Sequence, residues 1–175
     1  WLYWIHNSRC LVWTTNIASL IGDMTGLVLS NLDIELDLAF DGGSQDLWRG
    51  ITDQSMMLRL TDSQTWAQKI KLWIQLVRSD QTTNLSPLLR RTHSFTMGLQ
   101  FTDDPTITEL NRLWRQITEK TDVLSFPILD ETIVLPQDQS VELGDIVVSV
   151  ATAQRQARDN NHGLVKELRW LVSHG

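Results

Sequence analysis

Cysteine is almost absent from the sequence, with Cys10 alone among 175 residues. No disulfide within the chain and no zinc site built from several cysteines can form, which agrees with a protein of a reducing compartment. Basic residues are also in the minority, since 15 Lys and Arg stand against 21 Asp and Glu and the formal net charge is −6. This balance excludes a protein that coats nucleic acid by general phosphate neutralisation, so any nucleic-acid site must be local.

Long hydrophobic runs are lacking as well. Polar residues interrupt even the most apolar segment, residues 1–22, and no stretch reaches the roughly 18 apolar residues of a membrane span. No basic region precedes that segment, so a signal peptide fits poorly. With 42% hydrophobic and 21% charged residues, the composition is that of a soluble globular domain, and we expect a cytoplasmic protein without a membrane span.

Both ends of the chain look cut. It begins with Trp1, and its first methionine is Met24, just ahead of the first clear strand. It stops at Gly175, directly after an amphipathic stretch over 164–174. We therefore expect residues 1–23 to be an N-terminal extension or translated upstream sequence, and residues 24–175 to be one domain that is incomplete at its C-terminus.

Hydrophobic periodicity predicts the elements of this domain. Strict alternation over 32–40 and 95–101 predicts two strands, and short apolar runs at 123–129 and 145–150 predict two more. Pro127 marks the third strand as an edge strand, because proline cannot donate to a sheet ladder. Apolar residues three and four apart predict helices over 63–77, from 104, over 151–160 and over 164–174. The order predicts an α+β domain with a mixed four-stranded sheet packed with helices.

Four motifs follow one another in the second half of the chain: ELNRLWR at 109–115 leading into TDVLSFP at 121–127, LGDIVVS at 143–149, AQRQA at 153–157, and Glu167-Leu168 leading to His174-Gly175. In this order and spacing they resemble the YbeY family of endoribonucleases. The resemblance covers 27–175, most strongly from Thr108 onward.

The resemblance implies a zinc site on the C-terminal helix. In the family this helix continues as His-Gly-x-Leu-His-Leu-x-Gly-Tyr-Asp-His, and its three histidines bind one Zn²⁺ per chain. His174 would be the first ligand, and the other two would lie beyond Gly175. Two histidines four apart on a helix share one face, and three protein ligands leave a position open for water. The chain as given would therefore be inactive, and the complete protein would be the enzyme.

Three further residues are candidates for the site. The resemblance places Arg115 near the metal cleft, where a guanidinium could bind a phosphate with two hydrogen bonds and stabilise its developing charge. Asp122 and Ser125 lie in the signature strand and could line the cleft, although a turn Asp and a strand Ser are also ordinary structural residues. The family usually has Gly where this chain has Gln116, and often Tyr where it has Trp114.

The function implied is that of a single-strand-specific, zinc-dependent endoribonuclease acting in 16S rRNA 3′ end maturation and ribosome quality control. Its partners would be rRNA precursors or single-stranded RNA and the ribosome or small-subunit proteins. The alternative is a non-catalytic ribosome-binding or RNA-binding assembly module. A zinc peptidase is disfavoured, because Gly175 stands where its His-Glu-x-x-His motif needs the general base.

The other histidines and basic residues have ordinary interpretations. His6, His93 and His162 lack metal-like spacing and are expected to be surface or packing residues. Four basic residues on the two C-terminal helices could form a local positive strip beside the cleft: Arg155, Arg158, Lys166 and Arg169.

Overall fold

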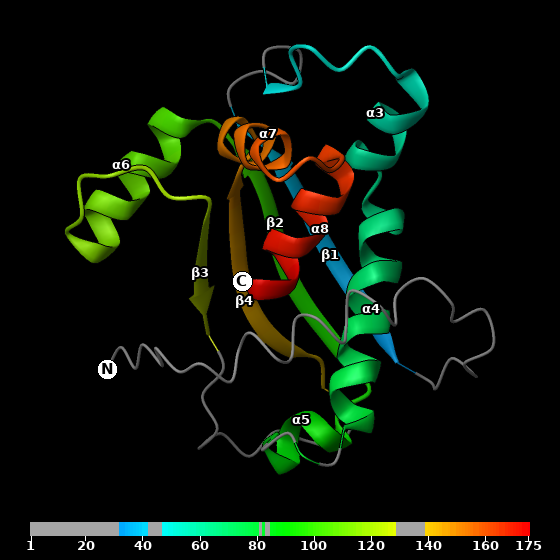
Figure 1. Ribbon diagram of the computed structural model, residues 1–175. Coiled ribbons are helices and arrows are strands. Elements are labelled where there is room, and N and C mark those ends of the chain that lie inside the picture. The colour runs from blue at the N-terminus through cyan, green and yellow to red at the C-terminus, as the bar shows by residue number, and fades with distance from the viewer. Residues whose placement is uncertain (1–31, 42–46, 81, 83–84, 129–138) are drawn as a thin grey trace. The chain divides into compact units, whose positions relative to one another are not determined.

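A computed structural model describes residues 32–41, 47–80, 82, 85–128 and 139–175 (Figure 1). All of them fall in one compact unit that spans 31–175. The expected extension over 1–23, and the expected boundary after it, lie outside the described residues. Within the described ranges, no helix is both long enough and apolar enough to cross a membrane.

Four strands form one mixed sheet. They are β1 (Asp33–Phe40), β2 (Ser94–Thr102), β3 (Val123–Pro127) and β4 (Val141–Ser149), and their order in the sheet is β1-β2-β4-β3. β2 pairs in parallel with both β1 and β4, whereas β3 pairs antiparallel with β4. The predicted fold class is confirmed, and β3 lies at an edge as Pro127 indicated.

The helices of the described residues comprise α3 (Gln54–Thr61), α4 (Ser63–Ser79), α5 (Pro87–Arg91), α6 (Asp104–Arg115), α7 (Val150–Asp159) and α8 (Leu164–His174). The sequence predicted α4, α6, α7 and α8. It did not assign α3 or α5, which are only eight and five residues long. Such short helices contain too few turns for a hydrophobic period to be recognised.

One face of the sheet is mainly apolar. On β2 the side chains of Phe95, Met97, Leu99 and Phe101 point to this face and are buried. α4 and α8 lie over it (Figure 1), and α4 contributes Trp66, whose ring centroid lies 5.3 Å from that of Phe101. The residues between these, such as Thr96, point to the other face because side chains alternate along a strand.

The opposite face is covered by α6 at the β3 end of the sheet. Ile107 of α6 is fully buried against Leu124 of β3 and Val147 of β4. The start of α6 is fixed by Asp103, because its carboxylate accepts a hydrogen bond of 2.8 Å from the backbone N–H of Thr106. β3 therefore lies between α6 on one face and the end of α8 on the other.

Candidate functional site

The site begins at the C-terminal end of α8, where His174 is exposed. Its Nδ1 lies 2.9 Å from the carbonyl oxygen of Trp170, one turn earlier, and the two rings are tilted at 44° to each other with centroids 4.2 Å apart. Only a protonated ring nitrogen can donate to a carbonyl, so the proton of a neutral His174 is on Nδ1. Nε2 then carries the lone pair, which is the form of histidine that ligates metals.

Trp170 was not singled out from the sequence. The signal that could have found it is its spacing, since residues four apart on a helix are neighbours on one face. Its ring and its carbonyl oxygen together fix the orientation of the His174 imidazole. A metal-ligating histidine is commonly held in this way by a backbone carbonyl.

The end of α8 lies directly against the signature strand. A Cβ at Gly175 would come within 2.8 Å of the Ile146 side chain and 3.1 Å of the Ser125 hydroxyl. These distances are shorter than normal contacts, so glycine lets the helix end approach the sheet this closely. The structure thus brings together two of the predicted site regions, Ser125 on β3 and the His174-Gly175 pair.

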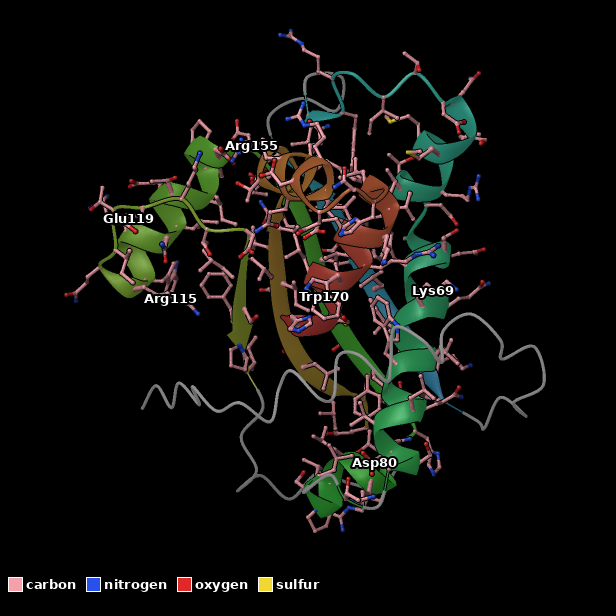
Figure 2. The ribbon with its side chains drawn as sticks, viewed as in Figure 1. Lys69, Asp80, Arg115, Glu119, Arg155 and Trp170 are labelled. Carbon is pink, nitrogen blue, oxygen red and sulfur yellow. The ribbon has the colours of Figure 1, made fainter. Side chains whose placement is uncertain are left out.

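Arg115 lies elsewhere. It is the last residue of α6, and Figure 2 shows it separated from Trp170 of α8 by the strands β3 and β4. Its guanidinium is half-buried and makes no hydrogen bond or ion pair with another residue of the described ranges. Arg115 therefore remains available for a ligand at the α6 end of β3.

Gln116 follows Arg115 in the left-handed conformation, with φ of 60°. Its N–H bonds to the carbonyl oxygen of Arg112 at 3.1 Å and closes the helix. This is the backbone conformation that glycine adopts most readily, so Gln116 holds it at some conformational cost.

Asp122 is held by structural contacts. One oxygen accepts a hydrogen bond of 2.9 Å from Gln156 of α7, and the other accepts one of 2.8 Å from the Val123 N–H. It also lies near Glu167 of α8, a buried carboxylate paired with His162 at 2.9 Å. Burial raises the pKa of Glu167, while His162 opposes this rise and Asp122 adds to it. Asp122 and Glu167 therefore lie close together where the residue before β3 meets α7 and α8.

Side-chain hydrogen bonds of Asp104 join α6 to α7 and β4. Its carboxylate accepts hydrogen bonds from Ser149 at 2.6 Å, from Thr152 at 2.8 Å and from Arg155 at 2.6 Å. Burial acts to raise the pKa of Asp104, but these three hydrogen bonds outweigh it and hold the pKa below its ordinary value. Because α6 runs from Asp104 to Arg115, this anchor also holds in place the helix that carries Arg115.

Asp104→Asn is expected to lower the free energy of unfolding by about 1–3 kcal/mol at neutral pH, because Arg155 loses its charged partner. A lowered folded-state pKa stabilises the fold above the unfolded value of about 4, and this contribution is lost as the pH falls through the folded value. The difference between the variant and the wild type should therefore shrink on acidification. Urea unfolding at several pH values measures it.

Asp103→Asn is the matched control for this prediction. Asp103 caps the same helix, and asparagine is as good an N-cap as aspartate, so little change is expected. Equal losses for the two variants, or a difference for Asp104→Asn that does not depend on pH, would contradict the assigned role of Asp104.

Part of the expected positive strip is used in this anchor, since Arg155 is bonded to Asp104. Arg169, by contrast, lies near other positive charges. Burial lowers the pKa of Lys69 on α4, and the charge of Arg169 lowers it further. Burial and the charge of Arg59 likewise lower the pKa of Arg169. Positive charge therefore gathers where α3, α4 and α8 meet, and not along α7 and α8 alone.

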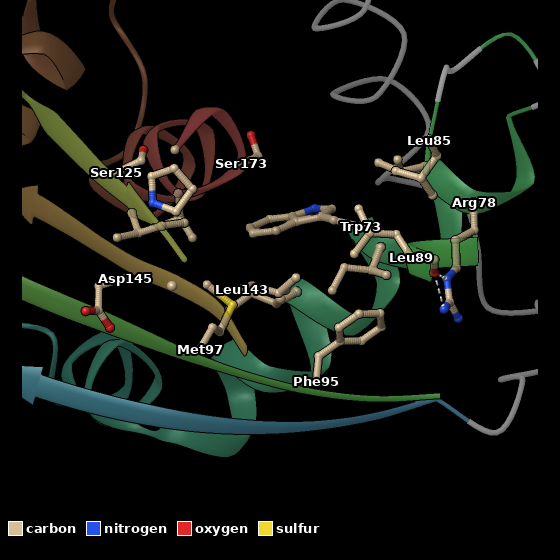
Figure 3. Close-up of a pocket in the computed structure, with 18 residues that line it drawn as sticks. Trp73, Arg78, Leu85, Leu89, Phe95, Met97, Ser125, Leu143, Asp145 and Ser173 are labelled. Atoms are coloured by element: carbon tan, nitrogen blue, oxygen red, sulfur yellow. Dashed lines mark hydrogen bonds between the residues drawn. The ribbon is translucent and has the colours of Figure 1, made fainter. Parts of the chain in front are cut away.

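A pocket of about 300 Å³ adjoins the end of α8 (Figure 3). It lies over the apolar face of the sheet, and its walls are mainly hydrophobic. Ser125, Ser173 and Gly175 form its border toward the candidate site, while Trp73 and Phe95 line its interior. Arg78 borders it too, but its guanidinium is bonded to the carbonyl oxygens of Leu89 and Thr92. These walls suit apolar groups better than a phosphate.

The described residues do not form a metal site by themselves. Within the described ranges, no three His, Cys, Asp or Glu side chains gather in a way that could hold an ion. A structural or catalytic zinc needs at least three protein ligands. His174 offers one suitable nitrogen, so the described residues could supply one ligand of a zinc site but not a complete set.

The fold and the site define an α+β protein with a mixed four-stranded sheet, whose C-terminal helix ends in an oriented histidine against an edge strand. The family profile described as "Endoribonuclease YbeY" matches residues 52–175. The Endoribonuclease YbeY of Prochlorococcus marinus strain MIT 9313 is 51% identical over 152 residues, which cover 87% of this chain and 81% of that protein. That of Synechococcus sp. strain CC9311 is 44% identical over 142 residues, covering 81% and 80%. The chain belongs to the YbeY family.

A solved structure is also similar. The solution structure of TM1509 from Thermotoga maritima aligns with a TM-score of 0.46 and 20% identity, covering 81% of this chain and 69% of that one.

Proposed function

We propose that the protein is a zinc-dependent endoribonuclease that cleaves single-stranded RNA in 16S rRNA 3′ end maturation and ribosome quality control. Relatives named Endoribonuclease YbeY, at 51% and 44% identity over most of the chain, support the activity. The observation that carries the metal part is the His174 ring, whose Nδ1 is bonded to the Trp170 carbonyl so that Nε2 is left for a ligand. RNA precursors and the ribosome would be its partners in the cytoplasm.

His174 would be the first of three zinc ligands, and two more histidines would follow Gly175. When bound, zinc would polarise a phosphate and lower the pKa of a bound water to about 7. The chain's own residues would prepare the site: Trp170 holds the imidazole, and Ser125 lies beside the helix end. Without the later histidines the 175-residue chain would neither hold the ion nor cleave RNA.

Arg115 would bind the substrate. Its guanidinium has no partner within the described ranges, and the helix that carries it is held in place by the Asp104 anchor. A guanidinium can bind a phosphate with two parallel hydrogen bonds. Because β3 and β4 separate Arg115 from α8 in Figure 2, it would bind a phosphate some way along the strand from the cleavage point.

Zinc stoichiometry tests the proposal on two proteins, the 175-residue chain and a version extended to the natural stop codon. We expect one zinc per chain in the extended protein only, and cleavage of rRNA precursors that a chelator abolishes. An extended protein that binds no zinc would refute the metal site. One that binds ribosomes without cleaving RNA would favour the non-catalytic assembly module.

A further inference from the structure

Large apolar side chains are exposed at the C-terminal end of α6 and beside it. Trp114 is 66% exposed, more than any other large hydrophobic residue in the described ranges. Two more exposed residues lie within three positions of it, Leu113 and Ile117. A tryptophan side chain buries a large apolar area when it finds a partner, so leaving it in water indicates a binding surface.

The ring of Trp114 is exposed but supported. It meets the ring of Phe126 on β3 with centroids 5.6 Å apart and an angle of 67° between the planes. In an edge-to-face contact the edge of one ring meets a single face of the other, so Phe126 covers at most one face of the indole, and the 66% exposure of Trp114 shows that indole surface remains open for stacking. The contact also ties the side chain to an edge strand, which reduces the conformational entropy lost when a ligand binds.

The backbone beneath the ring is fixed as well. Gln116 closes α6 two residues later, and the side-chain amide of Asn111 donates a hydrogen bond of 2.8 Å to the Glu119 carbonyl oxygen in the following loop. Asn111 is itself buried, so this bond joins the loop to the helix. The platform made of Trp114, Phe126 and Arg115 is therefore built on anchored elements.

The charged residues at the end of α6 determine which kind of ligand this platform can bind. Arg112, one turn before Arg115, forms an ion pair with Glu109 at 2.5 Å. Arg115 has no such partner, so it is the cation that the end of α6 leaves available within the described ranges. Arg115 directly follows Trp114 at the end of α6, so a free guanidinium and an open indole face are both within reach of one nucleotide unit, in which a phosphate and a base are joined through the sugar.

We propose that Trp114 stacks on a base of single-stranded RNA whose neighbouring phosphate is bound by Arg115. The proposal rests on the proposed function, since it takes RNA as the substrate. Stacked and paired bases of a duplex cannot reach the indole, so the platform selects unpaired RNA. The strand would cross the open edge of β3, with Trp114 and Phe126 on one face of the sheet and the end of α8 on the other.

The test is fluorescence anisotropy of a labelled single-stranded oligoribonucleotide, with chelator present so that no cleavage occurs. Trp114→Ala should weaken binding about tenfold, since stacking on one base has about that effect. Trp114→Phe should stay within about threefold of the wild type, because a smaller aromatic ring still stacks. Leu113→Ala is the matched control, an exposed apolar neighbour without a π-face, and should bind as the wild type does.

A second oligonucleotide of abasic ribose phosphates separates stacking from charge. The wild type and Trp114→Ala should bind it equally, whereas Arg115→Ala should bind it more weakly than either. Wild-type affinity of Trp114→Ala for normal RNA, or an equal loss on the abasic strand, would overturn the proposal. So would a variant that keeps its RNA affinity but loses binding to small-subunit proteins, since the surface would then be a protein interface.

These outcomes are distinct from failure of the proposed function. A wild type that binds single strands through Trp114 but never cleaves them, even when extended and loaded with zinc, would refute the nuclease and leave the platform standing. A wild type that cleaves RNA while Trp114→Ala binds and cleaves equally well would refute the platform alone. Thermal unfolding of each variant checks that the fold is intact.

Discussion

Gly144→Ala is expected to lower the free energy of unfolding by about 3 kcal/mol or more. Gly144 lies opposite Pro127 in the β3–β4 ladder and has φ of +108°, a conformation nearly restricted to glycine. A Cβ there would overlap the carbonyl oxygen of Phe126 and lie 3.0 Å from the Ile128 nitrogen. Both are backbone atoms, so the clash cannot be relieved by turning a side chain. Chemical denaturation measures the loss.

Gly50→Ala is the control that separates the two causes. Gly50 also has a positive φ, of 91°, but a Cβ there meets nothing within 4 Å. We expect the free energy of unfolding of this variant to fall by only about 1–2 kcal/mol, the cost of backbone strain alone. If the two variants lost the same amount, the close approach of β3 to β4 at Gly144 would not matter for stability. β3 also carries Ser125 of the candidate site and Phe126, which supports Trp114.

His174→Ala is expected to reduce RNA cleavage by about 100-fold or more in the protein extended past Gly175, since a catalytic zinc would lose one of three ligands. Zinc stoichiometry should fall with it. Binding of the single strand should change little, because the proposed RNA contacts lie on α6. Initial cleavage rates and bound zinc, measured on the same preparations, test the expectation.

His93→Ala is the matched control. His93 is also exposed, but it lies between α5 and β2 in the sequence, away from α8, and the variant should cleave as the wild type does. Unchanged hydrolysis by His174→Ala would remove the metal-ligand role. Loss of hydrolysis with ribosome binding retained would separate catalysis from docking.

Some elements could be predicted because their signal is local. The alternation from Leu32 to Phe40 appears as β1, where Asp33, Glu35 and Asp37 are exposed and the residues between them are less so. Asp62 caps α4, the helix predicted over 63–77, by accepting a hydrogen bond of 2.8 Å from the Thr65 N–H. Periodicity and capping depend on neighbours within a few residues, which the sequence states directly.

α5 shows where a local signal was present but too short. Ser86 caps this helix, and Pro87 occupies its first turn, the combination that commonly starts a helix. The helix then ends after five residues, before an apolar stripe can develop. Its main use is tertiary, since Leu88 packs with Phe95 in the core. Nothing in the spacing of the sequence indicates that contact.

For the candidate site, too, the sequence and the structure gave different information. The motif resemblance singled out His174, Ser125, Asp122 and Arg115 as site residues. The structure shows that Ser125 lies beside the helix end that carries His174, that Asp122 is bonded to Gln156, and that Arg115 lies on the α6 side of β3. Residue type alone could not distinguish a residue facing a cleft from one that holds two helices together.

The sequence by itself determined the four strands, the helices α4, α6, α7 and α8, the edge position of β3, the family and the identity of the residues to examine. These depend on period, proline chemistry and motif order, all of which are short-range properties of the chain. Only the tertiary structure decided which side chains meet. Asp104 binds Ser149 and Arg155, which lie 45 and 51 residues away along the chain. Such pairs form because strand order and helix packing bring distant segments together, and many arrangements of the same elements would satisfy the local pattern equally well.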